Sequence, residues 1–149
     1  MKLMTSLMNL WIGMSRKRKK NPNKTLRTKA WKLVSEWVRR LHADANGYTQ
    51  CYTCGATKHF KEMDCGHYIH SDVLDFETNN LRPQCTRCNK WLSGNGGIYC
   101  EKLIKEIGEE EISLMRQRSK QVKKWQIGEL EDMIETYKQT LKDLNSKNS

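Results

Sequence analysis

The stretch CYTCGATKHFKEMDCGHYIHSDVLDFETNNLRPQCTRCN, from Cys51 to Asn89, decides the fold of this chain. It opens with the pair Cys51/Cys54 and closes with the pair Cys85/Cys88, each spaced Cys-x-x-Cys. Each pair can coordinate a metal ion through one tight turn. Together the four thiolates complete the closed tetrahedral shell of a structural zinc ion. No secretory signal is recognisable, and in a reducing compartment such pairs bind zinc more often than they form disulfides. The spacing therefore predicts one structural Zn²⁺ held by these four cysteines.

The segment between the two cysteine pairs is unusually long. It contains 30 residues, where zinc ribbons hold about 15 to 20. This length leaves room for a β-hairpin inserted between the pairs. We expect one strand from Met63 to His70 and the returning segment from Leu74 to Leu81, with Ser71 and Asp72 near the turn.

Helices are expected on both sides of this segment. A helix from Thr25 to Ala45, ended by Gly47, has its apolar residues on one face. These are Ala30, Leu33, Val34, Trp37, Val38 and Leu41. Further helices are predicted from Ile98 to Ile107, from Glu109 to Lys120, and from Gly128 onward. The stripe of this last helix, Leu130 to Leu144, either forms a homodimer interface or is buried within one chain.

The length and the net charge of the chain indicate how many domains it forms and what kind of partner it binds. The chain has 149 residues and a formal charge of +10, which predicts one small domain and favours a polyanionic partner such as nucleic acid. We expect a disordered basic arm over residues 1–24, a single domain over 25–144 and a polar tail over 145–149. In the arm, Arg16, Lys17 and Arg18 are predicted to contact phosphates. The apolar stretch at residues 1–14 is too short to span a bilayer.

Two features of the central segment resemble a known family. They are His67 and the run Asn80-Leu81-Arg82-Pro83-Gln84, which stands before the second cysteine pair. This pattern resembles the HNH, or ββα-metal, nuclease motif, in which a β-hairpin and a helix surround one divalent metal. Three further runs are similar to the phage recombination protein NinG (Rap) family, whose members are implicated in cutting branched DNA. These runs are Asp64-Cys65-Gly66-His67-Tyr68, Gln84-Cys85-x-x-Cys88-Asn89 and Leu92-Ser93-Gly94-Asn95.

The resemblance assigns roles to individual residues. It implies that His67 is the general base that activates water, and that Asn80 braces the hairpin and orients this histidine. Asn89 takes the position of a ligand to a catalytic Mg²⁺ or Mn²⁺. The residue before His67 is a glycine where the family often has a ligand, so Asp64 or His70 must substitute; Asp64 is our prediction, although strand alternation places it opposite His67.

The sequence thus predicts an α+β protein with a zinc-stapled, HNH-like core and flanking α-helices. The expected function is metal-dependent cutting of branched DNA in the cytoplasm of a phage-infected or prophage-bearing cell, by a chain that also forms a homodimer. Arg82, Arg87 and Lys90 lie near enough in sequence to hold backbone phosphates. Two alternatives remain open: a non-catalytic zinc-dependent nucleic-acid-binding module, and a homing or restriction-type HNH nuclease that reads sequence.

Overall fold

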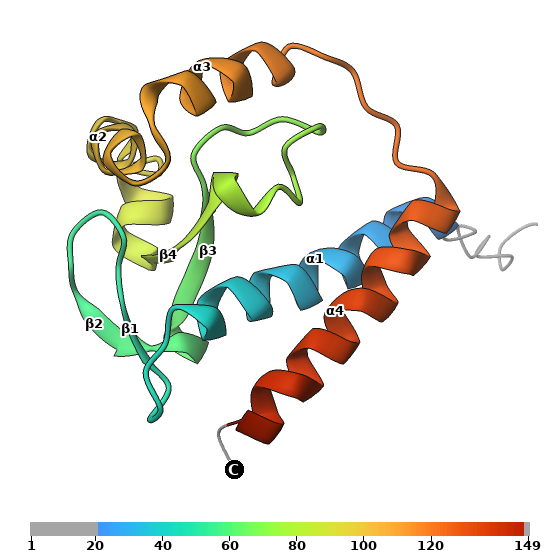
Figure 1. Cartoon of the computed structure of the whole chain (residues 1–149), viewed down its shortest axis with the longest axis horizontal. Coiled ribbons are helices and arrows are strands. Elements are labelled where there is room, and N and C mark those ends of the chain that lie inside the picture. Colours follow the sequence, from blue (N-terminus) through green and yellow to red (C-terminus); the bar gives the residue numbers. More distant parts are fainter. Residues whose placement is uncertain (1–20, 148–149) are drawn as a thin grey trace, which may run out of the picture.

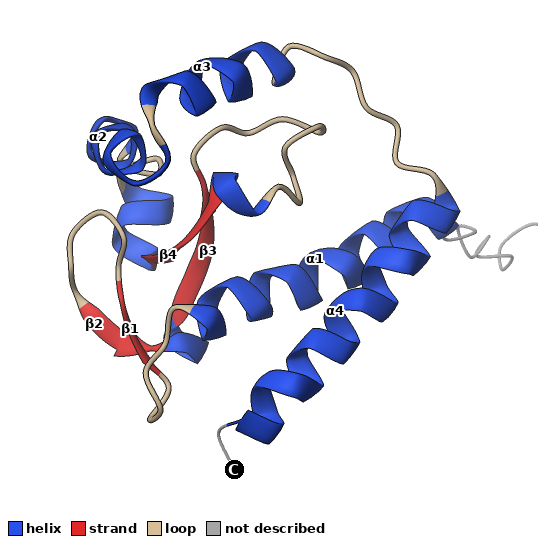
Figure 2. Cartoon of the chain, viewed as in Figure 1, coloured by secondary structure: helices blue, strands red, loops and turns tan. Residues whose placement is uncertain are grey.

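Helices surround two short β-hairpins in the computed structural model, which describes residues 21–147 (Figures 1 and 2). The fold is mixed α+β, as the sequence predicts. Along the chain the elements are α1 (Pro22–Leu41), β1 (Tyr48–Gln50), β2 (Thr57–His59), η1 (Phe60–Glu62), β3 (Met63–His67), η2 (Thr78–Asn80), β4 (Leu81–Cys85), η3 (Arg87–Trp91), α2 (Gly96–Ile107), α3 (Glu109–Arg118) and α4 (Ile127–Lys147).

The first helix begins and ends earlier than the apolar pattern indicates. Asn21 caps α1 by accepting a hydrogen bond from the Asn23 N–H at 3.0 Å, and Pro22 occupies the first turn, where its missing N–H costs nothing. After Leu41 the chain turns at Asp44, whose carboxylate accepts from two following N–H groups. Residues 22–24, predicted as part of the arm, therefore belong to the helix. Residues 1–20 of the arm, with Arg16, Lys17 and Arg18, lie outside the described residues.

The inserted hairpin exists, but its second strand is not where the sequence predicted it. β3 pairs antiparallel with β4 in a continuous register from Met63 opposite Cys85 to His67 opposite Leu81. The expected returning segment, residues 74–81, instead forms most of a long loop that ends in the short helix η2. A loop of residues 68–80 therefore connects the strands, and the second strand runs directly into the second cysteine pair.

The main core lies where α1 packs against α4 on one side and against β3 and β4 on the other (Figure 1). Ala30, Val34 and Val38 recur every four residues along α1, so they form one buried stripe. Leu130 and Ile134 of α4 meet this stripe. The apolar face of the last helix is thus buried within one chain, which is one of the two arrangements that the sequence leaves open.

A second, smaller cluster joins α2 to α3. Tyr99 and Leu103 of α2 are buried against Ile112 of α3. Both helices occur close to the predicted ranges, although α2 begins two residues earlier and α3 ends two residues earlier. Gly108, with φ of +89°, makes the sharp turn between them.

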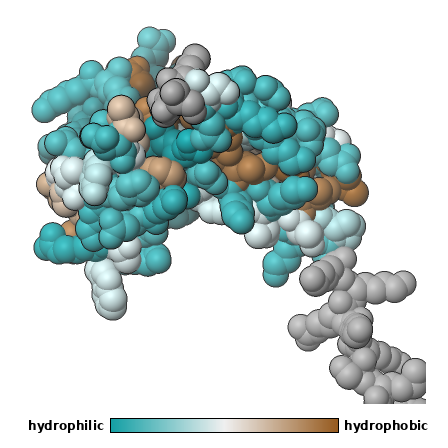
Figure 3. Space-filling model, turned by 90° about the horizontal axis from the view of Figure 1, so that it is seen from below, coloured by the Kyte–Doolittle hydropathy of each residue, from teal (hydrophilic) through white to brown (hydrophobic). Residues whose placement is uncertain are grey.

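The surface is largely hydrophilic, as expected of a chain in which 30% of the residues are charged. The face seen in Figure 3 is mostly hydrophilic, with hydrophobic groups in short stretches. Among the helices of residues 21–147, each is too short or too polar to cross a membrane.

Candidate functional site

The four predicted zinc ligands converge. Cys51 and Cys54 lie on the turn after β1, Cys85 ends β4 and Cys88 belongs to η3, and their sulfur atoms all lie within 4.8 Å of one another. Sγ of Cys54 is 3.7 Å from Sγ of Cys85. A tetrahedral shell with Zn–S bonds of about 2.3 Å places sulfur atoms about 3.8 Å apart. The cluster therefore has the dimensions of a zinc site.

The electrostatics of the cluster also suit a cation. Burial opposes ionisation of Cys51, but backbone N–H groups of Cys85 and Cys54 outweigh it and lower the pKa to about 6. At Cys54 the Ala56 N–H favours the thiolate, yet burial and the neighbouring thiols raise the pKa to about 12. One thiolate thus forms readily and the next resists forming beside it. A bound Zn²⁺ removes this repulsion, and it ties the β1–β2 turn to β4 and η3.

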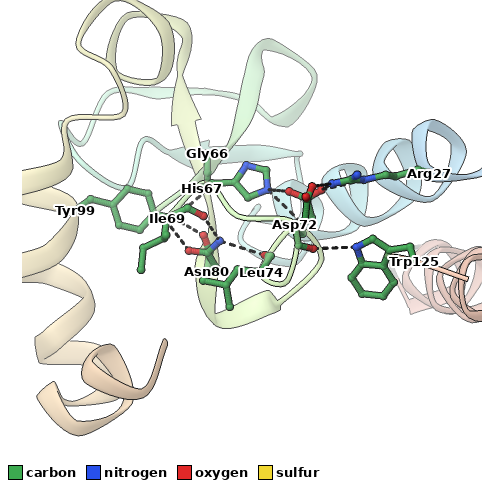
Figure 4. Close-up of polar contacts among 10 residues, drawn as sticks. Arg27, Gly66, His67, Ile69, Asp72, Leu74, Asn80, Tyr99 and Trp125 are labelled. Atoms are coloured by element: carbon green, nitrogen blue, oxygen red, sulfur yellow. Dashed lines mark hydrogen bonds and ion pairs between the residues drawn. The ribbon is translucent and has the colours of Figure 1, made fainter. Parts of the chain in front are cut away.

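His67, the last residue of β3, points toward α1 and the loop of residues 68–80 (Figure 4). Its ring stacks on Trp31 with centroids 4.7 Å apart, and its Nε2 lies 3.1 Å from the carbonyl oxygen of Asp75. Because a carbonyl oxygen only accepts, this contact assigns the proton to Nε2 and the lone pair to Nδ1. Within residues 21–147, Nδ1 makes no hydrogen bond, so its lone pair is free to accept a proton.

The surroundings of His67 favour its neutral form. Burial lowers the pKa of His67 below its usual 6.5, an effect that the Asp75 carbonyl and carboxylate oppose only in part. The ring lines a cavity of about 540 Å³ between α1 and the loop. The cavity is also lined by Lys24, Arg27, Thr28, Trp31, Asp75 and Phe76. At pH 7 the site therefore offers a neutral imidazole beside basic side chains.

Asn80 holds the loop closed from inside. Its side chain accepts a hydrogen bond from the Ile69 N–H at 2.8 Å, and it donates to the carbonyls of Ile69 and Leu74 at 2.8 and 3.2 Å (Figure 4). Tyr99 of α2 supports the same end of the hairpin by donating its hydroxyl to the Gly66 carbonyl at 3.0 Å. Asn80 is fully buried, so each of its bonds is protected from water. The position of the Asp75 carbonyl, and hence of His67, depends on this loop.

Arg27 holds the same loop from outside. Its guanidinium forms ion pairs with Asp75 and with Asp72, and its Nε donates to the Asp75 carboxylate at 3.1 Å. Trp125, on the segment that leads into α4, donates its indole N–H to the Asp72 carbonyl at 2.9 Å. Three contacts therefore fix the loop: Arg27 of α1, Trp125 on the segment before α4, and Asn80 within the loop itself (Figure 4).

Asp64 and Asn89, the two predicted ligands of a catalytic metal, lie together. The Asn89 side chain donates to the Asp64 carboxylate at 3.2 Å, and the Lys90 ammonium lies 3.8 Å from it. A carboxylate and an amide oxygen are hard donors of the kind that Mg²⁺ takes alongside several waters, once the amide is turned to present its oxygen. The pair thus offers at most two oxygen donors, and the Lys90 ammonium already lies beside the carboxylate. His70, the other candidate ligand, lies beside His67 instead, with ring centroids 5.2 Å apart.

His67 stands apart from this pair. Because β3 pairs with β4 without a bulge, its side chains alternate between two sides of the hairpin. Cys65 belongs to the core against α1, and His67 stacks on Trp31 of α1. Asp64 leaves the strand on the other side, toward η3. The structure thus brings Asp64 to Asn89, but places the predicted base on the opposite side of the strand.

The predicted phosphate-binding residues divide into two groups. Arg82 is 5% exposed, and its guanidinium pairs with Glu106 at 2.7 Å and donates to the Thr78 and Leu81 carbonyls. A buried arginine with all these partners cannot reach DNA, so the phosphate contact predicted for Arg82 is corrected to a structural role. Arg87 and Lys90 are exposed on η3 and remain available for phosphates.

Three residues around His67 were not identified from the sequence: Arg27, Trp31 and Asp75. Arg27 and Trp31 both lie outside the apolar stripe expected for the first helix. Asp75 fell inside a segment expected to be a strand. The contact between Arg27 and Asp75 spans 48 positions, and no local pattern indicates a pairing at that separation.

Comparison with known proteins gives one match. The sequence model of the family described as bacteriophage lambda NinG protein matches residues 13–147. No curated protein and no solved structure matches the chain. Since the family match covers nearly the whole chain, including both cysteine pairs and the hairpin between them, the chain belongs to the bacteriophage lambda NinG family.

Proposed function

We propose that this protein is a metal-dependent DNA endonuclease specific for branched recombination intermediates, such as Holliday junctions and D-loops. The observation that carries the proposal is the setting of His67. Its Nε2 is anchored on a backbone carbonyl, its Nδ1 is free, and burial keeps the ring neutral. A neutral histidine held in this way beside a cavity is suited to accept a proton from water. Membership in the NinG family supports a role in phage recombination.

The reaction follows from these contacts. Nδ1 of His67 accepts a proton from the water molecule that attacks phosphorus, while the Asp75 carbonyl keeps the ring in its tautomer. Asn80 acts as a positioning residue, because its three side-chain bonds fix the loop that carries Asp75. A Mg²⁺ or Mn²⁺ ion held by Asp64 and Asn89 would supply positive charge for a phosphate, and it would lie on the opposite side of β3 from His67.

The choice of branched DNA rests on charge and on the residues the helices carry. A formal charge of +10 favours backbone phosphates. Reading bases in the major groove usually requires a helix or ribbon with several Arg, Asn and Gln side chains. The charged residues of the helices here are mostly Lys and Glu, of which the lysines suit contact with backbone phosphates and recognition of DNA shape. Cutting both strands of a symmetric junction requires two sites, so we include a homodimer in the proposal.

Competition at physiological salt tests the proposal. A labelled four-way junction and a linear duplex of the same sequence are incubated together with the protein, with and without Mg²⁺. We expect Mg²⁺-dependent cutting of the junction and little cutting of the duplex. A cut sequence that stays fixed when the branch point is moved would instead identify a homing-type nuclease.

One observation favours a second candidate, a zinc-dependent nucleic-acid-binding protein without catalysis. His67 and the Asp64–Asn89 pair lie on opposite sides of β3, which a binding module tolerates and a single active centre does not readily use. Junction binding without cleavage at any Mg²⁺ or Mn²⁺ concentration would establish this candidate.

A further inference from the structure

The short helix η3 presents an unusual surface directly beside Asp64 and Asn89. Its inward residue, Cys88, is fully buried in the cysteine cluster. Its outward residues are Arg87, Lys90 and Trp91, and the indole of Trp91 is 81% exposed. In residues 21–147 Trp91 has no ring partner and Arg87 has no ion pair. The exposed indole offers an apolar face to a ligand, and Trp91 offers it next to two cationic residues of the same helix.

The exposure of Trp91 is built into the fold. The N–H of Leu92 donates to the Arg87 carbonyl at 2.9 Å, which closes the single wide turn of η3. Two hydrogen bonds fix the next turn. The Gly94 N–H donates to the Cys88 carbonyl at 2.9 Å, and the Gln84 side-chain amide donates to the Gly94 carbonyl at 2.8 Å. Trp91 therefore projects from a turn anchored to a zinc ligand. Because the backbone that carries Trp91 is already fixed, binding orders only the indole side chain.

The positive charges next to Trp91 indicate what kind of ligand this surface binds. Arg87 lies one turn before Trp91 in η3 and Lys90 directly precedes it, so two cationic residues lie next to Trp91 in this short helix, and the Lys90 ammonium also lies 3.8 Å from the Asp64 carboxylate. An aromatic face next to cationic residues matches a nucleobase flanked by phosphates, as in grooves that bind single-stranded DNA. In continuous duplex both faces of each base are covered by stacked neighbours. A base face becomes available only where stacking is interrupted, at a branch point, nick, gap or end.

We propose that Trp91 stacks on an unstacked base at a DNA branch point and thereby selects branched over linear DNA, with Arg87 and Lys90 on the adjacent phosphates. This inference rests on the proposed function, because it deepens the substrate choice of the same site. It assigns Trp91 a role in specificity and no part in the chemical step.

Binding without cleavage tests it. Affinities for a four-way junction and for a linear duplex of the same sequence are measured by fluorescence anisotropy without Mg²⁺ and with zinc retained. Trp91→Ala should weaken junction binding by about tenfold, in line with the loss of one stacked base, and leave duplex binding unchanged. Trp91→Phe should retain most of the preference. Val122→Ala, which removes another highly exposed apolar side chain from the α3–α4 linker, is the matched control and should change neither affinity.

A second readout reports on the base itself. With 2-aminopurine at the branch point, the wild-type protein should quench its fluorescence and Trp91→Ala should not. Arg87→Gln should weaken both DNAs equally and reduce the salt dependence, because it removes a phosphate contact. Zinc content and unfolding temperature verify that each variant is folded.

Three results would overturn the inference: wild-type-like junction binding by Trp91→Ala, equal loss of affinity for both DNAs, or a wild-type dimer that Trp91→Ala converts to monomer while DNA binding is unchanged. The last would make the surface a contact between two copies of the chain. These outcomes are independent of catalysis. A protein that selects junctions through Trp91 but never cuts them would reject the nuclease and leave the stacking role intact.

Discussion

His67 gives the most direct prediction for a single residue. His67→Ala should lower the cleavage rate by a factor on the order of 10² to 10⁴, the usual contribution of a general base. Zinc content and junction affinity should stay close to the wild-type values, because the ring contacts neither the cysteine cluster nor the η3 surface. His42→Ala, at the end of α1, is the matched control and should cut at the normal rate. Unchanged cleavage by His67→Ala would exclude His67 as the base.

Arg27 should control the pH dependence of the same histidine. The guanidinium neutralises Asp75, whose carboxylate lies 3.9 Å from His67 Nε2, while Asp72 also binds Arg27 and His70 faces the ring. In Arg27→Gln the free carboxylate stabilises the charged imidazole, so the pKa of His67 should rise from its lowered value. The acid limb of the cleavage rate then moves to higher pH.

Proton NMR titration of the His67 ring measures this shift without any cleavage. Lys29→Gln, which removes an exposed charge from α1, is the control and should leave the titration unchanged. A lower or identical pKa in Arg27→Gln would show that the Asp75 carboxylate does not reach His67.

How far the sequence predicts individual residues depends on the type of signal. The sequence identified the zinc ligands because the spacing within each pair is a local signal. The structure brings the four cysteines together, Cys51, Cys54, Cys85 and Cys88. Asp64 was predicted from its nearness to His67 in sequence. The position of its carboxylate beside Asn89, 25 residues away, depends on how η3 packs on the hairpin. Arg82 was misassigned because a basic residue near a site has the same sequence signature whether it is exposed or buried.

At the scale of elements, the zinc site should be essential for folding. Cys88→Ser should abolish zinc binding and unfold the hairpin region, because an ion held by the four cysteines would join the β1–β2 turn to β4 and η3, and its binding free energy would be part of the folding free energy. Metal analysis should give about one zinc per wild-type chain. Cys100→Ser, a half-buried cysteine outside the cluster, is the control and should retain both metal and fold. A folded, zinc-free Cys88→Ser protein would contradict this role.

Helices were easier to predict than the second strand of the hairpin, for a physical reason. A helix repeats its apolar residues over many turns, so the stripes of α1 and α4 are long signals. β4 is five residues, all buried, with a proline in its centre and no alternation. Proline lacks an N–H and usually argues against a strand. Here Pro83 contributes its carbonyl to Tyr52 at 2.8 Å, a contact that only the folded chain reveals.

At the scale of the whole molecule, α1 and α4 join the two ends of the described chain. Leu130→Ala should reduce the free energy of unfolding by about 2 to 5 kcal/mol, because it leaves a cavity between two helices in the main core. Leu114→Ala, on the exposed side of α3, is the control and should have little effect. Chemical denaturation of both variants measures the difference. Equal stabilities would mean that α4 does not close the core.

The packing of α1 against α4 also limits which surface a homodimer can use. Leu130, Ile134 and Leu141 are buried, so the apolar stripe of α4 is already occupied by α1. A homodimer able to cut both strands of a junction must therefore use another surface. The sequence alone left both arrangements of this stripe open, because an apolar helical face does not specify which partner covers it.

The order of synthesis gives the α1–α4 contact a further consequence. A ribosome translating this chain releases α1 early and α4 only after the zinc hairpin, α2 and α3. Until α4 emerges, one buried stripe of α1 remains in water, and Trp31 on that helix supports His67 from an unfinished core. All four cysteines are therefore translated before the core behind His67 can be completed. Under the nuclease proposal, catalytic competence would then be the last property that the chain acquires during translation.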